Sequence, residues 1–261
     1  MSLSYQESGD RGSHSLIFLH GFLGSRHDWD SVVSHFPQYR CIATDLPGHG
    51  KSELSLETLL DVESQAKEVA SLLDALEISQ AHFVGYSWGG RVLLSLQEQR
   101  AEIVRSMALL STSPGIIDEG EREKRVKEDE RWAERIEEDF GLFLEEWYAQ
   151  PLFQHLKSRS DLFEKMLSAR KRNSPRAMAE VIVKASPGRN PHHWQRLTAL
   201  TIPVLILTGS LDEKYAGIAS HMATRNRNFS VDRVAKAGHC LHLEQPMQVT
   251  NRLQRFLGEI K

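Results

Sequence analysis

A serine held between small residues has the clearest chemical potential in this chain. Ser87 lies at the centre of residues 85–90, Gly-Tyr-Ser-Trp-Gly-Gly, which contain the pattern G-x-S-x-G. The glycines allow the backbone to turn sharply without Cβ clashes. Such a turn between a strand and a helix projects the serine hydroxyl above the end of a sheet. Ser87 is therefore predicted to be a nucleophile, the alternative being a solvated serine in a glycine-rich turn.

An aspartate and a histidine follow Ser87 in the order that an activated serine requires. A nucleophilic serine needs a base, and the base needs an orienting acid. Asp212 comes just after an apolar run at 203–208, and His239 follows a weaker strand pattern at 230–234. The ends of parallel strands meet at one edge of a sheet. We therefore expect a Ser87–Asp212–His239 triad, although with 12 histidines in the chain His239 alone would suggest a surface or core role.

Two backbone N–H groups are candidates for an oxyanion hole. The sequence His20-Gly21-Phe22 follows the apolar run at 16–19. The N–H of Phe22 and that of Trp88, directly after the serine, are predicted to donate to one oxygen atom. His20 itself is expected to hold the loop rather than to act as a second base.

The elements that must position these residues alternate between strands and helices. Continuous apolar runs predict buried strands, whereas apolar residues at helical spacing predict amphipathic helices. The strands are expected at 16–19, 40–44, 81–84 and 103–110, and the helices at 59–76 and 91–97. This order is typical of an α/β fold with a mostly parallel, doubly wound sheet and helices on both faces.

The composition changes after Pro114. Residues 118–146 are dense in charges of both signs with aromatic residues at helical intervals, and a second helical stretch covers 162–185 with a break near Ser174-Pro175. No strand-like run occurs between Leu110 and Val204. We expect an all-helical cap at residues 115–199, inserted into a core of residues 1–114 and 200–261 that ends in a helix at 247–260.

Charge and cysteine content exclude several classes of protein. The chain has 261 residues and a formal charge of −3, which gives no electrostatic basis for nucleic-acid binding. Two cysteines, Cys41 and Cys240, favour a reducing compartment over a disulfide framework. The N-terminus lacks the pattern of a signal peptide, and no apolar run is long enough to span a membrane. A cytoplasmic monomer is expected.

No cofactor is predicted. Residues 45–52 approach a phosphate-binding loop, but Asp45 stands where the P-loop pattern needs glycine. No cysteine and histidine cluster has zinc-ligand spacing.

These motifs together resemble the α/β-hydrolase superfamily over almost the whole chain. The residues that carry the resemblance are 20–22, 45–50, 85–90, 209–212 and 238–239. A narrower resemblance to the MenH family of menaquinone biosynthesis rests on Gly85 to Arg91, on Arg122-x-x-Arg125-x-x-x-Asp129-x-x-Trp132, and on Phe143-x-x-x-Trp147-Tyr148-x-Gln150-Pro151-Leu152-Phe153. The last stretch is the most specific, because esterases of this fold have unrelated caps.

The narrower resemblance implies a lyase rather than a hydrolase. Members of that family eliminate pyruvate from 2-succinyl-5-enolpyruvyl-6-hydroxy-3-cyclohexene-1-carboxylate, a small substrate with several carboxylates. The resemblance implies that the triad removes a ring proton and that Arg91, Arg125 and Arg170 bind carboxylates, with Tyr86 and Trp147 as pocket walls. Each arginine could instead be a solvated surface residue, and Trp147 could equally be a core residue of the cap.

Two other functions stay open from the sequence. A carboxylic-ester or carbon–carbon bond hydrolase would need the same triad. A non-catalytic ligand receptor would keep the fold, although an intact triad argues against it.

Overall fold

The computed structural model describes residues 3–52 and 59–260. Within these residues, seven strands form one sheet in the order β1-β3-β2-β4-β5-β6-β7. The strands are β1 (Tyr5–Ser8), β2 (Ser15–Leu19), β3 (Arg40–Thr44), β4 (Ala81–Tyr86), β5 (Val104–Leu110), β6 (Val204–Gly209) and β7 (Phe229–Val234). β1 pairs antiparallel with β3, and the remaining neighbours pair in parallel. The central strands β2 and β4 are buried along their whole length, as their apolar sequences predict.

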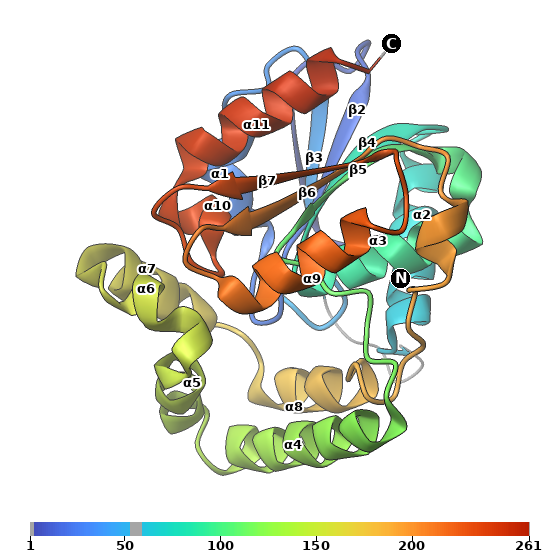
Figure 1. Ribbon diagram of the computed structural model, residues 1–261. Coiled ribbons are helices and arrows are strands. Elements are labelled where there is room, and N and C mark those ends of the chain that lie inside the picture. Colours follow the sequence, from blue (N-terminus) through green and yellow to red (C-terminus); the bar gives the residue numbers. More distant parts are fainter. Residues whose placement is uncertain (1–2, 53–58, 261) are drawn as a thin grey trace.

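Helices cover both faces of this sheet. They are α1 (Asp30–Val33), α2 (Val62–Ala75), α3 (Trp88–Gln99), α9 (Glu213–Ala223), α10 (Leu241–Glu244) and α11 (Pro246–Gly258). The helix α1 packs against α11, and α2 packs against α3 on the opposite side of the sheet (Figure 1). The predicted doubly wound arrangement is confirmed. Among the described residues, no helix combines the length and apolar character that crossing a membrane requires.

All the described elements between β5 and β6 are helical. They are α4 (Glu119–Glu138), α5 (Phe140–Ala149), α6 (Gln154–Lys157), α7 (Ser160–Arg170) and α8 (Pro175–Lys184), with two short 3-10 helices at Pro151–Phe153 and Arg196–Ala199. Figure 1 shows α4–α8 grouped at one end of the sheet, apart from the helices that flank it. We call α4–α8 the cap. The prediction of an inserted helical cap is confirmed, while its boundaries at residues 115 and 199 stay a prediction.

Local sequence explains where the cap helices begin. Ser174 accepts a hydrogen bond from the N–H of Ala177 at 3.3 Å, and Pro175 is the first residue of α8. Both residues favour a helix start, so the predicted break between α7 and α8 lies where the sequence indicated. The helix α4 exposes most of its charges but buries Ile136. In α5, Phe143 and Leu144 complete the apolar stripe.

Asparagine side chains join the cap to the core. The amide oxygen of Asn173 accepts from the N–H of Gly50 at 3.3 Å, and its amide nitrogen donates to the carbonyl of Leu23 at 2.8 Å. Asn190 accepts from the N–H of Val62 at 2.8 Å. These bonds fix cap segments to the loops at the sheet edge, so that the space between cap and core is preformed.

The edge strand β1 was not expected from the sequence. Its residues, Tyr-Gln-Glu-Ser, contain no apolar run, and Tyr5 and Gln6 are exposed. The strand is held by its antiparallel pairing with β3 and by an ion pair of 3.0 Å between Arg40 and Glu7. Strands that are half solvated at a sheet edge give no continuous apolar signal.

Buried histidines make the fold sensitive to acid. Burial lowers the pKa of His82 to about 4 and that of His242 to about 3. Below pH 6.5 the unfolded chain therefore binds protons that the folded chain does not. We expect the free energy of unfolding to fall with decreasing pH between about 6.5 and 4, by roughly 1.4 kcal/mol per pH unit for each such histidine.

Denaturant unfolding measured across this pH range tests the expectation. The variant His242→Phe preserves an aromatic ring at a position where neither ring nitrogen has a hydrogen-bond partner. In this variant the free energy of unfolding should fall less steeply with decreasing pH, because one of the two buried histidines no longer contributes. An identical slope in this variant and in the parent protein would contradict the prediction.

Candidate active site

The predicted serine turn joins β4 to α3. Ser87 has φ 47° and ψ −102°, a strained conformation for a residue with a Cβ, and its N–H donates to the carbonyl of Leu110 at 2.8 Å. Strain of this kind persists where surrounding structure enforces it and is concentrated at functional sites. The turn brings Gly89 close to β2. A Cβ on Gly89 would lie only 2.4 Å from the carbonyl oxygen of Leu19.

This close approach predicts a large effect of one methyl group. In Gly89→Ala the new Cβ would meet backbone atoms of Leu19 and His20, which cannot move independently of β2. We expect thermal and denaturant unfolding to show a loss of about 1–3 kcal/mol of stability. The matched control is Gly217→Ala in α9, where nothing lies within 4 Å of the added Cβ. It should be stabilised by about 0.5–1 kcal/mol. Equal effects of the two changes would contradict the steric argument.

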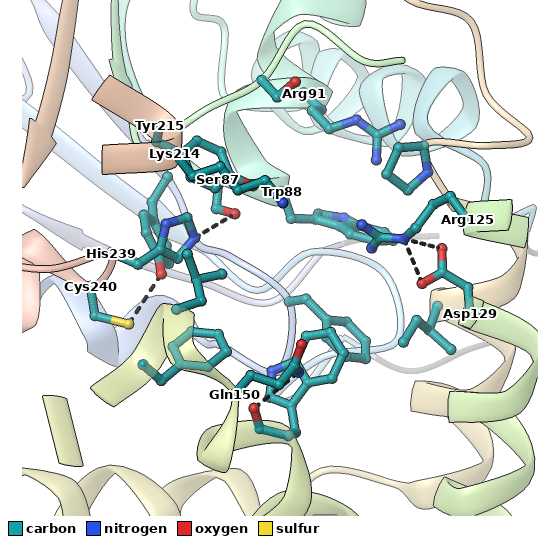
Figure 2. A pocket seen from close by; sticks show the side chains of 18 of the residues that line it. Ser87, Trp88, Arg91, Arg125, Asp129, Gln150, Lys214, Tyr215, His239 and Cys240 are labelled. Carbon is teal, nitrogen blue, oxygen red and sulfur yellow. Dashed lines mark hydrogen bonds and ion pairs between the residues drawn. The ribbon is translucent and has the colours of Figure 1, made fainter. Parts of the chain in front are cut away.

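The three predicted triad residues form one hydrogen-bonded chain. The Nδ1 atom of His239 lies 2.8 Å from Oδ2 of Asp212. Its Nε2 atom lies 3.2 Å from Oγ of Ser87 (Figure 2). Because an ionised carboxylate only accepts, Nδ1 is the donor to Asp212, which leaves Nε2 free to accept the proton of Ser87. His239 and Asp212 are both buried. The three residues lie in the order that the sequence predicted, and their role as a catalytic triad stays a prediction.

Local structure positions Asp212 and His239. Asp212 follows β6 and caps α9, accepting from the N–H of Tyr215 at 3.2 Å. The adjacent Leu211 N–H donates to the carbonyl of Ala237 at 2.9 Å, which ties this loop to the one that carries His239. The two strand-end loops are therefore fixed side by side.

The side chains of the two residues that are predicted to supply the oxyanion hole lie close together. Trp88 is the first residue of α3, so its N–H has no carbonyl partner within the helix. The rings of Phe22 and Trp88 have centroids 5.7 Å apart. His20 bonds the carbonyl of Gly21 through Nδ1 at 2.8 Å and accepts from the N–H of Leu46 at 2.9 Å through Nε2. It holds the loop, as the sequence predicted, while the role of the two N–H groups stays a prediction.

A cavity of about 500 Å³ lies between the cap and the Ser87 turn. Asp212 lies behind His239 and does not line it, whereas the other predicted site residues do. These are Phe22, Tyr86, Ser87, Trp88, Arg91, Arg125, Trp147, Arg170 and His239. The structure therefore brings residues from both parts of the chain to one space.

Arg91 and Arg125 lie on the side of the cavity away from His239 (Figure 2). Arg91 is buried and donates through Nη1 to the carbonyl of Ala185 at 3.0 Å. Burial, together with the nearby charge of Arg125, lowers the pKa of Arg91 to about 10. Arg125 donates from Nε to both carboxylate oxygens of Asp129, at 2.8 and 2.9 Å. The terminal nitrogens of Arg125 take no part in these two bonds.

The third arginine is fully engaged. Arg170 donates from its two Nη atoms to the two oxygens of Asp28, at 2.8 and 2.7 Å, and from Nε to the hydroxyl of Tyr148 at 3.3 Å. Burial alone would lower the pKa of Arg170, but Asp28 and Tyr148 hold it above its usual value. A substrate carboxylate could take the bidentate position on Arg170 only by displacing Asp28.

Trp147 lies at the boundary between the cavity and the cap. Its ring lines the cavity and lies 5.4 Å from that of Phe22, a residue of the core. It also packs within the cap, with centroids 5.5 Å from Trp132 and 5.7 Å from Phe143. Trp147 is therefore at once a wall of the cavity and a member of the cap's aromatic cluster.

The sequence analysis assigned no role to several residues around the site. Asp28 binds both Nη atoms of Arg170, Asp129 binds Nε of Arg125, and the ring of Tyr215 lies 4.4 Å from that of His239. The spacing of Asp129, four residues after Arg125 on one helix, was an available signal. Asp28 lies 142 positions from Arg170 and had none.

Cys240 is adjacent to His239 but is not an activated thiol. Its sulfur lies 3.2 Å from the hydroxyl of Tyr86. Burial raises the pKa of Cys240 to about 12, so the thiol stays protonated and packs against the site. Within residues 3–52 and 59–260, no three histidine, cysteine or acidic side chains are grouped as metal ligands would be.

The fold and the site define a class. The chain belongs to the alpha/beta hydrolase fold family, whose model matches residues 14–246. Within that family it is 31% identical over 255 residues to the 2-succinyl-6-hydroxy-2,4-cyclohexadiene-1-carboxylate synthase of Serratia proteamaculans, which covers 96% of each protein. The enzyme of the same name from Citrobacter koseri is 30% identical over 251 residues, covering 95% of this chain and 96% of the relative.

Solved structures agree with these sequence relatives. The structure of MenH from S. aureus has a TM-score of 0.93 and 29% identity, covering 99% of this chain and 98% of the other. The resemblance to MenH predicted from the motifs is confirmed. A thermophilic esterase from Thermogutta terrifontis has a TM-score of 0.87 at 22% identity, over 99% of this chain and 93% of the esterase, and shares the fold.

Proposed function

We propose that this protein eliminates pyruvate from 2-succinyl-5-enolpyruvyl-6-hydroxy-3-cyclohexene-1-carboxylate, as the synthase of menaquinone biosynthesis. One observation carries the proposal: two buried or half-buried arginines face the same cavity as the Ser87–His239 pair. A neutral ester gives no reason for this charge, whereas a substrate with several carboxylates does. The relatives from Serratia proteamaculans and Citrobacter koseri, which are named for that activity, support the same function.

In the proposed mechanism the triad acts as a base. His239 accepts the proton of Ser87 through Nε2, and Asp212 stabilises the imidazolium that forms. The Ser87 oxygen then removes a ring proton of the substrate. Negative charge spreads to the succinyl carbonyl, whose oxygen accepts from the N–H groups of Phe22 and Trp88.

Elimination follows from the carbanion. The electron pair left on ring carbon 2 forms a double bond to carbon 3, the existing double bond between carbons 3 and 4 shifts to carbons 4 and 5, and the bond between carbon 5 and the enolpyruvyl oxygen breaks. The departing enolate of pyruvate takes one proton, supplied from His239 through the active site, and Ser87 is left in its starting hydroxyl form. Protons and electrons balance without a cofactor.

We further propose that Arg91 and Arg125 bind the substrate carboxylates. Asp129 holds Nε of Arg125 and so directs the two terminal nitrogens of the fork. A bound substrate anion would offset two unfavourable terms: the repulsion between Arg91 and Arg125, and the cost of burying the charge of Arg91. The ion pair of Arg170 and Asp28 forms part of the cavity wall. Arg170 binds a substrate carboxylate only when that carboxylate displaces Asp28. Tyr86 and Trp147 enclose the ring.

The direct test is incubation with the enolpyruvyl substrate. Pyruvate release, coupled to lactate dehydrogenase, is expected to be far faster than hydrolysis of a neutral nitrophenyl ester measured in parallel. Ester hydrolysis without pyruvate release would instead favour the carboxylic-ester or carbon–carbon hydrolase alternative. Substrate binding without either reaction would favour a non-catalytic receptor. Sedimentation of the same sample tests the predicted monomer.

A further inference from the structure

A second cavity, of about 640 Å³, lies between α7 and the loops that follow β2 and β3. Helix α10 contributes His242 and Leu243 to its wall. Asp28, Arg170 and Leu243 line both this cavity and the one at Ser87. The Asp28–Arg170 ion pair is therefore the partition between two separate spaces.

The second cavity has a surplus of positive charge. Five lysine and arginine side chains line it, against three aspartates. Of the arginines, Arg26 pairs with Asp45 and Arg170 pairs with Asp28. Within the described residues, the side chains of Lys51, Lys165 and Arg172 have no ion-pair or hydrogen-bond partner. All three side chains are exposed at the rim of the cavity, where their charges are available to an anion that enters it.

Two of these cations are held near one another. The hydrogen bond between Gly50 and Asn173 joins the loop after β3 to the end of α7. Lys51 and Arg172 are the chain neighbours of the two residues in this bond. Lys165 lies two turns before Arg172, on the face of α7 that lines the cavity. Three cations therefore face one space from two elements.

The inner wall carries an unsatisfied polar group. His242 is 1% exposed, and neither of its ring nitrogens has a hydrogen-bond partner. Its ring packs 4.7 Å from that of Trp29 and 4.3 Å from that of Tyr86. Buried polar atoms normally have partners, and a neutral imidazole has one N–H donor and one acceptor nitrogen, so this ring in the cavity wall can hydrogen-bond a bound molecule.

We propose that this second cavity binds an organic anion distinct from the substrate of Ser87. Lys51, Lys165 and Arg172 hold its anionic group. An apolar body packs against Leu162, Met166 and Leu243, and reaches the imidazole of His242. The volume suits a ligand of drug-like size. Since Asp28 and Arg170 border both cavities, an occupant can alter the fork that faces the first. The proposal does not depend on the reaction at Ser87.

Calorimetric titration with 2-naphthoate tests the site, with neutral 2-naphthamide as the uncharged match. The parent protein is expected to show a binding event for the carboxylate that the amide lacks. In the variant Lys51→Gln/Arg172→Gln this event should weaken by about tenfold or more, because the ligand loses two charge-assisted hydrogen bonds. The control Lys127→Gln/Lys157→Gln removes the same charge from exposed positions elsewhere on the cap.

Two further variants locate the event. Arg125→Met alters the first cavity only and should retain naphthoate binding. His242→Phe preserves the ring packing and should weaken naphthoate binding, and its unfolding curve checks that it folds. The proposal is wrong if the Lys51/Arg172 variant binds like its charge-matched control, or if naphthamide binds as tightly as naphthoate. Loss of the event in Arg125→Met would instead assign it to the first cavity, and unchanged affinity in His242→Phe would contradict the assigned inner wall.

Discussion

Replacing Ser87 with alanine is expected to lower kcat for pyruvate elimination by about a thousandfold or more. The change removes the oxygen that takes the ring proton, and general-base catalysis contributes on the order of 10²–10⁴ to the rate. The hydroxyl makes its triad bond, of 3.2 Å, to Nε2 of His239. Alanine retains the Cβ and can occupy the same backbone conformation as Ser87, so the change should leave the fold intact. Steady-state pyruvate release and thermal unfolding measure the two effects.

Substitutions of Asp212 and His239 are expected to impair the same catalytic step as substitution of Ser87. Asp212→Asn removes the acceptor that fixes the proton on Nδ1 of His239, and His239→Ala removes the base itself. Their effects on kcat are expected not to add to that of Ser87→Ala in double variants. Near-normal pyruvate release by Ser87→Ala, or additive losses, would remove the triad from the mechanism.

Replacing Arg91 or Arg125 with alanine should reduce kcat/KM for pyruvate elimination far more than it reduces ester hydrolysis. Each change leaves a substrate carboxylate without its charged partner in a largely buried site, which costs about 2–5 kcal/mol. A neutral nitrophenyl ester has no carboxylate to lose. The measured quantity is the ratio of the two kcat/KM values, which should fall by roughly 30-fold to several thousandfold.

Matched variants separate recognition from general damage. Arg176→Ala removes an arginine of α8 that is largely exposed and does not line the cavity, and it should leave the ratio unchanged. Arg125→Lys retains the charge but loses the planar fork, so an intermediate fall is expected. If the ratio in Arg91→Ala and Arg125→Ala equals that of Arg176→Ala, the arginines do not recognise the substrate.

The sequence placed the three predicted triad residues together because each lies near a local strand pattern. Ser87 and Asp212 follow strands whose apolar residues are contiguous, His239 follows a weaker strand pattern, and parallel strands bring their ends to one edge of the sheet. The same logic predicted the cap, because helical periodicity is visible within 20 residues. Neither inference needed a contact between distant residues.

What the sequence left hidden depends on distant polar contacts. The pairing of Arg170 with Asp28 joins a cap helix to a core loop, and no local pattern distinguishes this arginine from its exposed neighbours Lys171 and Arg172. The packing of Tyr215 on His239 likewise depends on how α9 lies against the last loop. Strand β1 was missed because it is stabilised by its neighbour rather than by its own residues.

The positive φ of Ser87 has an evolutionary consequence. A residue held in this conformation costs on the order of 1–3 kcal/mol, a substantial part of a typical protein's stability. Glycine at this position would recover much of that cost, and it is accessible by few nucleotide changes. In a copy of the gene that no longer performs chemistry, replacing the serine costs no function and gains stability, so the serine is expected to be lost. Retention of a strained serine turn is therefore expected where the serine hydroxyl contributes to function.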